Sequence, residues 1–405
     1  MSGFLKRLGS FLLILTLGVT LFGAGVIVGG GGRPALAAQS GSASPLRPLL
    51  EVWDLLHREY YQRPLDDVAL VRGAMDGMLA VPGDPHTRYM PPDEFEAFNQ
   101  TLEGELEGIG VEVDVQGGRL VVVSAIEGSP AAAAGLRAGD VIVAVDGQAV
   151  EAAKSPLSVI SLVRGKAGIS VTVTIERGRE RQELTIVRAR IPLQSVRGRL
   201  MESDGSAIGL VRLSSFGNKT AAELRTVLQA QLPKAEKGLI LDLRGNPGGA
   251  LDTAIQVVSE FIGDGTVMIE EWGPGQQQRY PARSGGLATT VPLVVLIDAG
   301  SASASEIVAG AIQDRGRGTL IGSRSFGKGT VQSWHALAGD NGGVRITSAR
   351  WLTPTGRWIQ AKGLKPDIEI ANTAPGRDRQ LEAAVGLLNG EPVVSDLPPW
   401  ERYRQ

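Results

Sequence analysis

The sequence contains no cysteine and only three histidines among its 405 residues. The absence of cysteine excludes thiol catalysis, disulfide bonds and thiolate metal sites, and it leaves the redox compartment open. His57, His86 and His335 are not arranged as HExxH or in another close ligand spacing, so we expect no metal site and no cofactor. The formal net charge of −2 provides no basic footprint for nucleic acid. These absences argue against thiol enzymes, metalloenzymes and nucleic-acid-binding proteins.

The N-terminus has the layout of a secretory signal. Lys6 and Arg7 precede an apolar run at residues 11–28, and the small-residue segment Ala35-Leu36-Ala37 follows. A positive region, an apolar region and an A-x-A site predict cleavage after Ala37. The alternative is a retained membrane anchor, because the run is near the lower length limit of a membrane span. Under both interpretations residues 1–38 direct export, and we expect a periplasmic, lumenal or extracellular protein.

Residues 39–103 are expected to form a linker and a small helical part. Leu49, Val52, Trp53 and Leu56 recur at helical spacing, and a second helix, a turn at residues 84–86 and a short third helix follow. We interpret this part as a packing subdomain and His86 as a structural residue of the turn. A dimerisation or substrate-gating surface is the alternative.

From residue 104 to residue 190 the hydrophobic period changes from 3.6 to 2, which predicts short strands. These strands, two helices (one at residues 157–163), the segment Gly108-Ile109-Gly110-Val111 and the run AGLRAGDVIVAVDG resemble a PDZ domain of the bacterial type. The resemblance implies that backbone N–H groups of the glycine loop bind a terminal carboxylate while the tail joins the sheet edge. Ile109 and Val111 would then line a pocket for an apolar last residue.

Residues 191–375 alternate strands and helices, which predicts an α/β unit, and residues 376–405 form a C-terminal helix and tail. A buried strand at residues 291–297 runs through small residues into a helix at residues 306–314. This layout holds a hydroxyl at a helix N-terminus beside free backbone N–H groups. Lys328 stands between glycines after the next strand. A serine on one turn and a lysine on the next predict a Ser–Lys dyad.

Four motifs of this unit resemble those of the carboxy-terminal processing (tail-specific) proteases: LDLRGNPGG, GSASASEI, FGKGTVQ and KGLKPDIEI. Together with the PDZ-like segment, they extend in one order over about residues 45–390. The resemblance implies a multidomain α/β protein in which a PDZ-like domain precedes a crotonase-like serine protease core. It also implies an exported endopeptidase that recognises a free, apolar C-terminus of a protein or peptide and cuts nearby.

The same resemblance assigns roles to individual residues. Ser303 would be the nucleophile, Lys328 its base, and Gln332 the residue that orients the lysine. The backbone N–H of Ala304 and that of Gly248 or Gly249 would bind the oxyanion. The motif positions of the dyad are intact, whereas Asp298 stands where many relatives carry a neutral amide.

Elementary chemistry limits which charged residues can take part. A lysine base must be neutral, and because the ordinary pKa of a lysine side chain is about 10.4, the site has to bury it. Phe326 and the flanking glycines permit that burial. Asp314 is in phase with Ser303, but 11 residues along an unbroken helix is about 16 Å, so we assign it to structure. Glu306 is expected to be a carboxylate of the first helical turn, and His335 an unlikely base.

Two rival functions stay open at this point. One is a non-catalytic PDZ-type peptide-binding scaffold with a silent core. The other is an amidase or esterase acting on small molecules, which the PDZ-like segment disfavours. The sequence leaves the natural substrate, the cut position, membrane anchoring and homo-oligomer formation undetermined.

Overall fold

The structure is a computed structural model that describes residues 44–116, 119–126, 128–150, 163–371 and 377–396. The expected secretory signal and most of the helix expected at residues 157–163 lie outside these residues. The chain divides into two compact units, Met1–Val71 and Arg72–Gln405. Helix α3 (Asp67–Ala80) crosses the boundary between them. Within the described part of the chain, no helix combines the length and apolarity that a membrane crossing needs.

The described part of the first unit is built on α2 (Arg47–Glu59). Its apolar side chains recur on one helix face, as the sequence predicts, but Leu49 and Val52 of this face are exposed. His57 at the end of α2 donates a hydrogen bond from Nε2 to Asp67 Oδ1 (2.8 Å). This unit therefore has little core of its own.

In the second unit, the end of α3 is followed by a short strand, β1 (Arg88–Met90), and by α4 (Pro92–Leu102). Strand β1 pairs with β18 in the antiparallel sense, with Arg88 opposite Arg345. This pairing brings the turn at residues 84–87 next to β18, the strand that pairs with the strand following Lys328.

The PDZ-like segment is an antiparallel sheet with the strand order β3-β4-β5-β7-β8 and β6 beside β5. Its elements are β2 (Glu105–Gly108), β3 (Val111–Gln116), β4 (Arg119–Ala125), α5 (Pro130–Ala133), β5 (Val141–Val145), β6 (Gln148–Ala149), β7 (Ser170–Arg177), β8 (Glu180–Val187) and β9 (Ala189–Pro192). Strands β2 and β9 pair with each other outside this sheet. Strands β7 and β8 form an antiparallel hairpin across Gly178. Buried Asp140 of the GD turn accepts two hydrogen bonds from Arg177 (both 2.7 Å), which fixes the turn.

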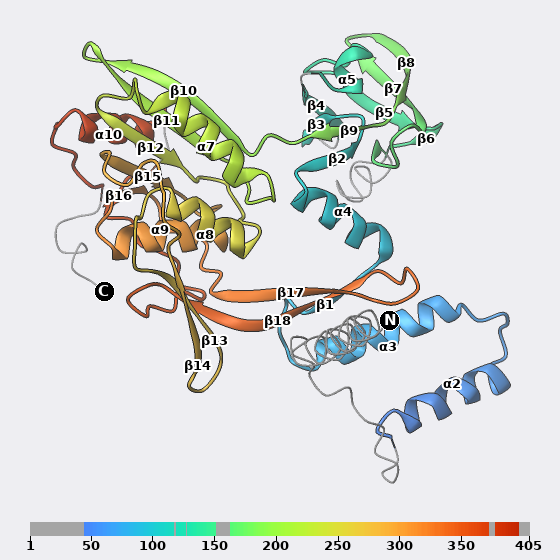
Figure 1. Ribbon diagram of the computed structural model, residues 1–405. Helices are drawn as coiled ribbons and strands as arrows, with labels where there is room; N and C mark the ends of the chain where they lie inside the picture. The colour runs from blue at the N-terminus through green and yellow to red at the C-terminus, as the bar shows by residue number, and fades with distance from the viewer. Residues whose placement is uncertain (1–43, 117–118, 127, 151–162, 372–376, 397–405) are drawn as a thin grey trace, which may run out of the picture. The chain divides into compact units, whose positions relative to one another are not determined.

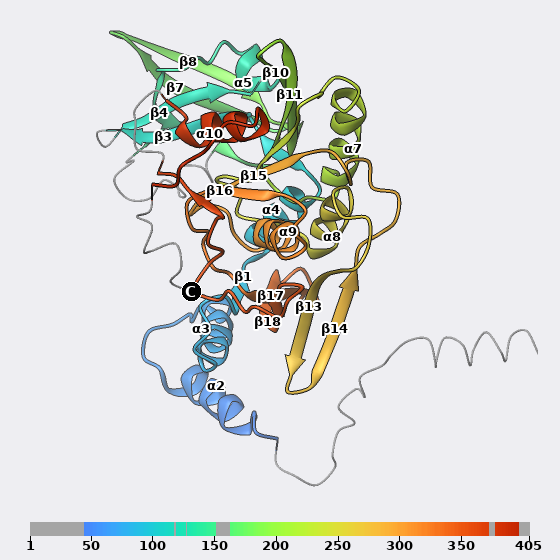
Figure 2. The same cartoon turned by 90° about the vertical axis from the view of Figure 1, so that its left-hand side faces the viewer.

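The core of the protein is a six-stranded sheet with the order β10-β11-β12-β15-β16-β19, parallel from β11 to β19. Its elements are β10 (Val196–Ser203), β11 (Ser206–Leu213), α7 (Thr220–Gln231), β12 (Gly238–Asp242), α8 (Leu251–Ser259), β15 (Leu293–Ile297), α9 (Ala304–Asp314), β16 (Thr319–Gly322), β19 (Ile368–Glu369) and α10 (Arg379–Leu388). Strands β12 and β15 are buried along their whole length, as expected of parallel strands covered on both faces. Helices α7, α8 and α9 cover one face, and α10 covers the other (Figures 1 and 2).

A second antiparallel sheet consists of β13 (Thr266–Gly273), β14 (Gln276–Pro281), β17 (Thr330–Ala336) and β18 (Gly343–Leu352), with β1 at the edge of β18. Trp351 of β18 is almost fully buried and belongs to the same apolar cluster as α8 and α9. The expected fold class, a PDZ-like domain before an α/β core, is confirmed. Strands β1, β10 and β14 were not expected from the sequence, because their polar or very short segments lack a clear hydrophobic alternation.

Candidate active site

The turn that carries Ser303 connects β15 to α9 and has a strained backbone. Ser303 is the N-cap residue of α9, with φ 54° and ψ −114°. A non-glycine residue at positive φ is uncommon and costs of order 1–3 kcal/mol, so it persists only where surrounding contacts impose it. Nucleophiles on sharp strand-to-helix turns have this kind of geometry.

The three serines of the motif have different surroundings. The Ser301 hydroxyl donates to the Leu243 carbonyl (2.9 Å), and the Ser305 hydroxyl donates to the Asn246 carbonyl (2.9 Å). Both of these serines are completely buried, whereas Ser303 is half-buried. Ser301 and Ser305 therefore anchor the turn to the neighbouring NPGG turn, and Ser303 is the accessible hydroxyl.

The NPGG turn lies directly against the serine turn. A Cβ on Gly248 would stand 2.8 Å from the Ala302 carbonyl oxygen, 2.9 Å from the Ala304 nitrogen and 3.0 Å from Ser303 Cβ. Gly248 also has φ +101°, where an L side chain is strained. Only glycine therefore allows the two turns to approach this closely.

The two candidate oxyanion donors of the NPGG turn differ in their bonding. The Gly248 N–H already donates to Asn246 Oδ1 (2.9 Å). The Gly249 N–H has no hydrogen-bond partner among the described residues. On the outer side, Asp298 Oδ1 accepts the N–H groups of Gly245 (2.8 Å) and Gly300 (2.9 Å) and so ties the beginnings of the two turns together.

The lysine turn is held by backbone contacts on both sides of Lys328. A Cβ on Gly327 would stand 2.7 Å from the Gly363 nitrogen, and the Lys328 carbonyl accepts the indole N–H of Trp351 (2.9 Å). Lys328 is half-buried, but Phe326 is 60% exposed. Phe326, which the sequence permits as a cover for the lysine, is largely exposed, and the buried Trp351 contacts the turn.

The electrostatic environment of Lys328 lowers the pKa of its ammonium group. Burial is the main cause, because it penalises the charged form, and the positive charge of Arg345 acts in the same direction. The carboxylates of Glu306 and Asp84 oppose this shift. The result is a lysine that is more easily neutral than a surface lysine, which is the requirement for a base.

Glu306 connects the serine turn to the lysine turn. Its Oε2 accepts the Ser303 N–H (2.8 Å) and the Lys328 N–H (2.9 Å), while its Oε1 accepts the Gly327 N–H (2.7 Å). Glu306 was correctly expected in the first helical turn, but its contact with the lysine motif was not foreseen. The capping pattern cannot reveal that contact, because it depends on a loop about 20 residues further along the chain.

The groups that surround Lys328 from other elements were also not foreseen. Arg345 of β18 donates from Nε to the His86 carbonyl (2.6 Å), and the Thr347 N–H donates to Thr87 Oγ1 (3.0 Å). His86 has a lowered pKa, mainly through burial and then through the charge of Lys328. The pairing of β1 with β18 thus places the turn at residues 84–87 beside the lysine, and no local pattern indicates this.

The structure does not bring every expected residue into contact. Among the described residues, no hydrogen bond joins the Ser303 hydroxyl to the Lys328 ammonium, or Gln332 to Lys328. Gln332 is buried on β17, and its amide nitrogen donates to Thr330 Oγ1 (2.8 Å) and Thr347 Oγ1 (3.3 Å). Asp314 accepts hydrogen bonds from the N–H and hydroxyl groups of Thr355, so it serves the end of α9 rather than the dyad.

The expected tail-binding loop lies at the start of an edge strand. Gly110 has φ +77°, and a Cβ there would stand 2.4 Å from Ser129 Cβ. Ile109 is 1% exposed in the core of the PDZ-like segment, and half-buried Val111 packs against that core. Within the described residues, β3 pairs only with β4, and the N–H groups of Ile109 and Gly110 have no hydrogen-bond partner. Backbone donors and a free strand edge are therefore present.

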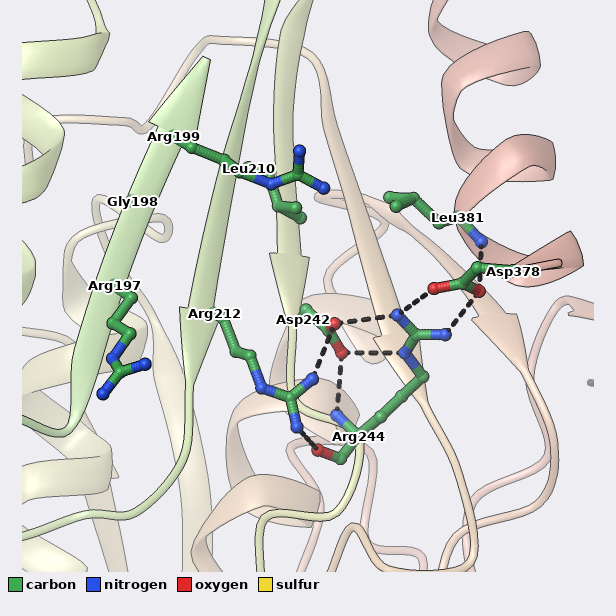
Figure 3. A pocket seen from close by; sticks show the side chains of 9 residues that line it. All are labelled: Arg197, Gly198, Arg199, Leu210, Arg212, Asp242, Arg244, Asp378 and Leu381. Atoms are coloured by element: carbon green, nitrogen blue, oxygen red, sulfur yellow. Dashed lines mark hydrogen bonds and ion pairs between the residues drawn. The ribbon is translucent and has the colours of Figure 1, made fainter. Parts of the chain in front are cut away.

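A pocket of about 350 Å³ lies beside α10, and its lining includes neither dyad residue. In this pocket Arg244 lies between Asp242 and Asp378 and donates hydrogen bonds to both carboxylates (Figure 3). Burial alone would lower the pKa of Arg244, but the two carboxylates raise it above its ordinary value. The network joins the strand before the NPGG turn to the N-cap of α10.

In the part of the chain that the structure describes, no group of three or more His, Asp or Glu side chains could hold a metal ion.

Two protein-family models match this chain. The model of peptidase family S41 matches residues 207–370, and the PDZ domain model matches residues 108–187. A carboxy-terminal-processing protease of Bartonella bacilliformis is 38% identical over 83% of this chain and 77% of its own length. The carboxy-terminal processing protease CtpA of Bacillus subtilis is 37% identical over 79% of this chain and 68% of its own length.

Among solved structures, a photosystem II D1 C-terminal processing protease superposes with a TM-score of 0.53 and 30% identity, over 86% of this chain and 98% of its own. The family matches, the relatives and the shared fold agree with one another. The chain therefore belongs to the carboxy-terminal processing proteases of peptidase family S41, and it is a serine-type peptidase with a PDZ domain that acts on proteins or peptides.

Proposed function

We propose that this protein is an exported endopeptidase that cleaves near the C-terminus of its substrates with a Ser303–Lys328 dyad. The observation that carries the proposal is the strained, half-buried Ser303 at the start of α9, tied through one carboxylate to the turn of a half-buried lysine. Lys328 also has a lowered pKa, as a general base needs.

The reaction would proceed through an acyl-enzyme. Neutral Lys328 takes the proton of the Ser303 hydroxyl as Oγ attacks the scissile carbonyl carbon, and it then gives that proton to the leaving amine. A water molecule attacks the ester in the second half, with Lys328 again as base. The Ser303 and Lys328 side chains have no mutual hydrogen bond in the structure, and catalytic contacts commonly tighten only when substrate is bound.

The oxyanion would be bound by the N–H groups of Ala304 and Gly249. Ala304 is the first residue of α9, where the N–H is free and the helix dipole favours negative charge. We assign Gly249 rather than Gly248 as the second donor, because the Gly248 N–H is taken by Asn246. The role of Gly248 is then to let the NPGG turn approach the serine turn closely, because it has no side chain. Gln332 retains an amide oxygen that can accept a hydrogen bond from Lys328 and orient it.

Substrate recognition would use the loop from Gly108 to Val111 and the free edge of β3. The N–H groups of Ile109 and Gly110 are unsatisfied within the described residues and form a carboxylate site, while the tail extends the sheet. An apolar last residue suits the apolar surroundings of Val111. We assign this tail-binding domain to residues 104–190, between a helical part at 39–103 and the catalytic core at 191–375.

Export is proposed from the N-terminal signal pattern at residues 1–38. Its test is N-terminal sequencing of the protein recovered outside the cytoplasm: a start at Ala38 supports cleavage, and a start at Met1 in the membrane fraction supports an anchor. Recovery in the cytoplasm with an intact N-terminus contradicts export.

The dyad is tested with the Ser303→Ala and Lys328→Arg variants. Lysine-to-arginine exchange keeps the charge but removes a group that can become neutral, so both variants should lose turnover by at least about 10³-fold. The scaffold alternative predicts no turnover by the native protein either, and failure of a fluorophosphonate to label Ser303 would support it. Turnover by Lys328→Arg near the native rate contradicts the dyad.

A further inference from the structure

The Glu306 side chain is completely buried, yet it has four hydrogen-bond donors around it. In addition to the three backbone N–H groups of Ser303, Gly327 and Lys328, the Ser325 hydroxyl donates to Oε1 (2.6 Å). Burial raises the pKa of Glu306, and these four hydrogen bonds oppose that shift. Burying a carboxylate costs free energy unless its oxygen lone pairs accept hydrogen bonds.

The four contacts distribute evenly over the two oxygens. Oε2 accepts from Ser303 and Lys328, and Oε1 accepts from Ser325 and Gly327. Three of the four donors are backbone N–H groups that cannot reverse their role. The site therefore requires two acceptor-only oxygens, a condition that an ionised carboxylate meets and an amide does not.

We propose that Glu306 is a positioning residue that sets the separation of Ser303 and Lys328 by binding the backbone of both turns at once. The inference rests on the proposed dyad and adds a residue to it. One atom, Glu306 Oε2, binds both turns: it lies 2.8 Å from the Ser303 nitrogen and 2.9 Å from the Lys328 nitrogen. Any shift of one turn is thus transmitted to the other.

A role in capping α9 alone does not account for these contacts. A cap needs only the bond to the Ser303 N–H, whereas the other three go to residues 325–328, outside the helix. The negative charge also opposes the lysine's function, because it raises the pKa of Lys328. Burial and Arg345 offset this cost, so the carboxylate is present for its geometry.

The test compares Glu306→Gln with Glu306→Asp in the full-length enzyme. Glutamine has one acceptor oxygen, so at least one backbone N–H must face its NH₂ group whichever way the amide is turned. We expect kcat to fall about 10- to 100-fold, with KM within about threefold, as for the loss of one buried hydrogen bond expressed in the transition state. Aspartate is one methylene shorter and cannot span both turns, so kcat should fall in Glu306→Asp as well.

The pH profile separates positioning from general damage. The groups that face Lys328 are Glu306 from α9, Arg345 from β18, and Asp84 and His86 from the turn before β1. Glu306→Gln removes one negative charge, so the pKa of Lys328 falls and the acidic limb of kcat/KM moves to lower pH. Glu306→Asp keeps the charge, and its acidic limb should stay near the native position.

The matched control is Glu260→Gln, another buried glutamate in the same core. Its carboxylate accepts hydrogen bonds from the Arg225 guanidinium and the Leu287 N–H and touches neither turn. Its Tm should fall, but kcat and the acidic limb should stay native. If Glu306→Gln lacks a cooperative thermal transition, Glu306→Asp carries the test.

The outcomes are distinguishable. Folded Glu306 variants with native kcat overturn the positioning role while the dyad stands. Native turnover in Ser303→Ala overturns the proposed function itself. Lower kcat in both Glu306 variants, with the limb shifted only in Glu306→Gln, supports the inference.

Discussion

At the residue scale, the charge state of Lys328 is a balance between opposed neighbours. Burial and Arg345 lower the pKa of its ammonium group, and Glu306 and Asp84 raise it. Arg345 is fixed in place because its Nε donates to the His86 carbonyl (2.6 Å). The base is therefore tuned by residues that lie far from it in the sequence.

This balance predicts that Arg345→Met moves the acidic limb of kcat/KM to higher pH. Removing a positive charge makes the protonated form of Lys328 less costly, so its pKa rises and a higher pH is needed to form the neutral base. The measurement is a pH–rate profile on a peptide substrate.

The matched control is Arg350→Met on the same strand, where the arginine pairs with Glu271 instead. Its acidic limb should stay at the native position. A shift of the Arg345→Met limb to lower pH would contradict the electrostatic explanation.

At the residue level, the sequence motifs point to Ser303 and Lys328, whose catalytic roles stay predictions. Ser303 and Lys328 occupy motif positions, and they lie on adjoining turns that Glu306 connects. Arg345 and His86 could not be recognised, because their place beside Lys328 depends on the pairing of β1 with β18. A dyad requires a buried lysine, and Lys328 is half-buried, but local sequence does not show that Phe326 is exposed while Trp351 contacts the turn from within the core.

At the element scale, the close approach of the NPGG turn to α9 predicts that Gly248→Ala is inactive. The added methyl would meet the Ala302 carbonyl and the Ala304 nitrogen at under 3.0 Å, at a φ of +101°. The turns must then separate, and kcat/KM should fall by about 10²–10³, the loss typical of one missing oxyanion donor.

Its control is Gly273→Ala in the β13–β14 hairpin, where a Cβ would meet no atom within 4 Å. Assays of both variants on one peptide, with Tm values, check the prediction. An active Gly248→Ala enzyme would show that the two turns need not touch.

The ion pair between Arg244 and Asp378 attaches helix α10 to the core sheet. We therefore expect the Asp378→Ala variant to be less stable than the native protein. Asp378 also accepts the Leu381 N–H as N-cap (3.1 Å), so the free energy of unfolding should fall by about 2–3 kcal/mol for the lost cap and charged hydrogen bond. Urea unfolding measures this difference. Asp264→Ala, which breaks an exposed pair with Arg315, should cost less than about 1 kcal/mol.

The same pair predicts a pH dependence. Burial would raise the pKa of Asp378, but the hydrogen bond from Arg244 lowers it below its ordinary value. A depressed pKa contributes stability above the unfolded pKa, and that contribution is lost as the pH falls through the folded value. The difference between the native protein and Asp378→Ala should therefore shrink below about pH 4. An equal difference at all pH values would rule out the carboxylate as its source.

Among the elements, the long periodic ones could be predicted and the short or polar ones could not. A C-terminal helix was expected within residues 376–405, and α10 spans Arg379–Leu388. Strand β10 escaped recognition because Arg197 and Arg199 interrupt its apolar pattern. Strand β1 has only three residues, too few for any period to appear.

At the scale of the whole molecule, a PDZ domain and a serine peptidase share one chain. The described PDZ-like segment offers unpaired backbone N–H groups and a free strand edge, which in our proposal bind the terminal carboxylate and the backbone of a substrate tail. Amidation of a substrate's C-terminus should therefore lower kcat/KM by at least about tenfold, the value of a charged hydrogen bond. N-terminal acetylation of the same peptide should have no effect. Equal loss from both modifications would argue against tail recognition.

The decisive measurement is the intact mass of two tailed proteins after incubation with residues 39–405 or with their Ser303→Ala variant. One protein carries an apolar C-terminal tail, and the other differs only in a charged tail. We predict that the native enzyme alone shortens the apolar-tailed protein and leaves the charged-tailed one intact. Cleavage by Ser303→Ala at the native rate would show that Ser303 is not the nucleophile.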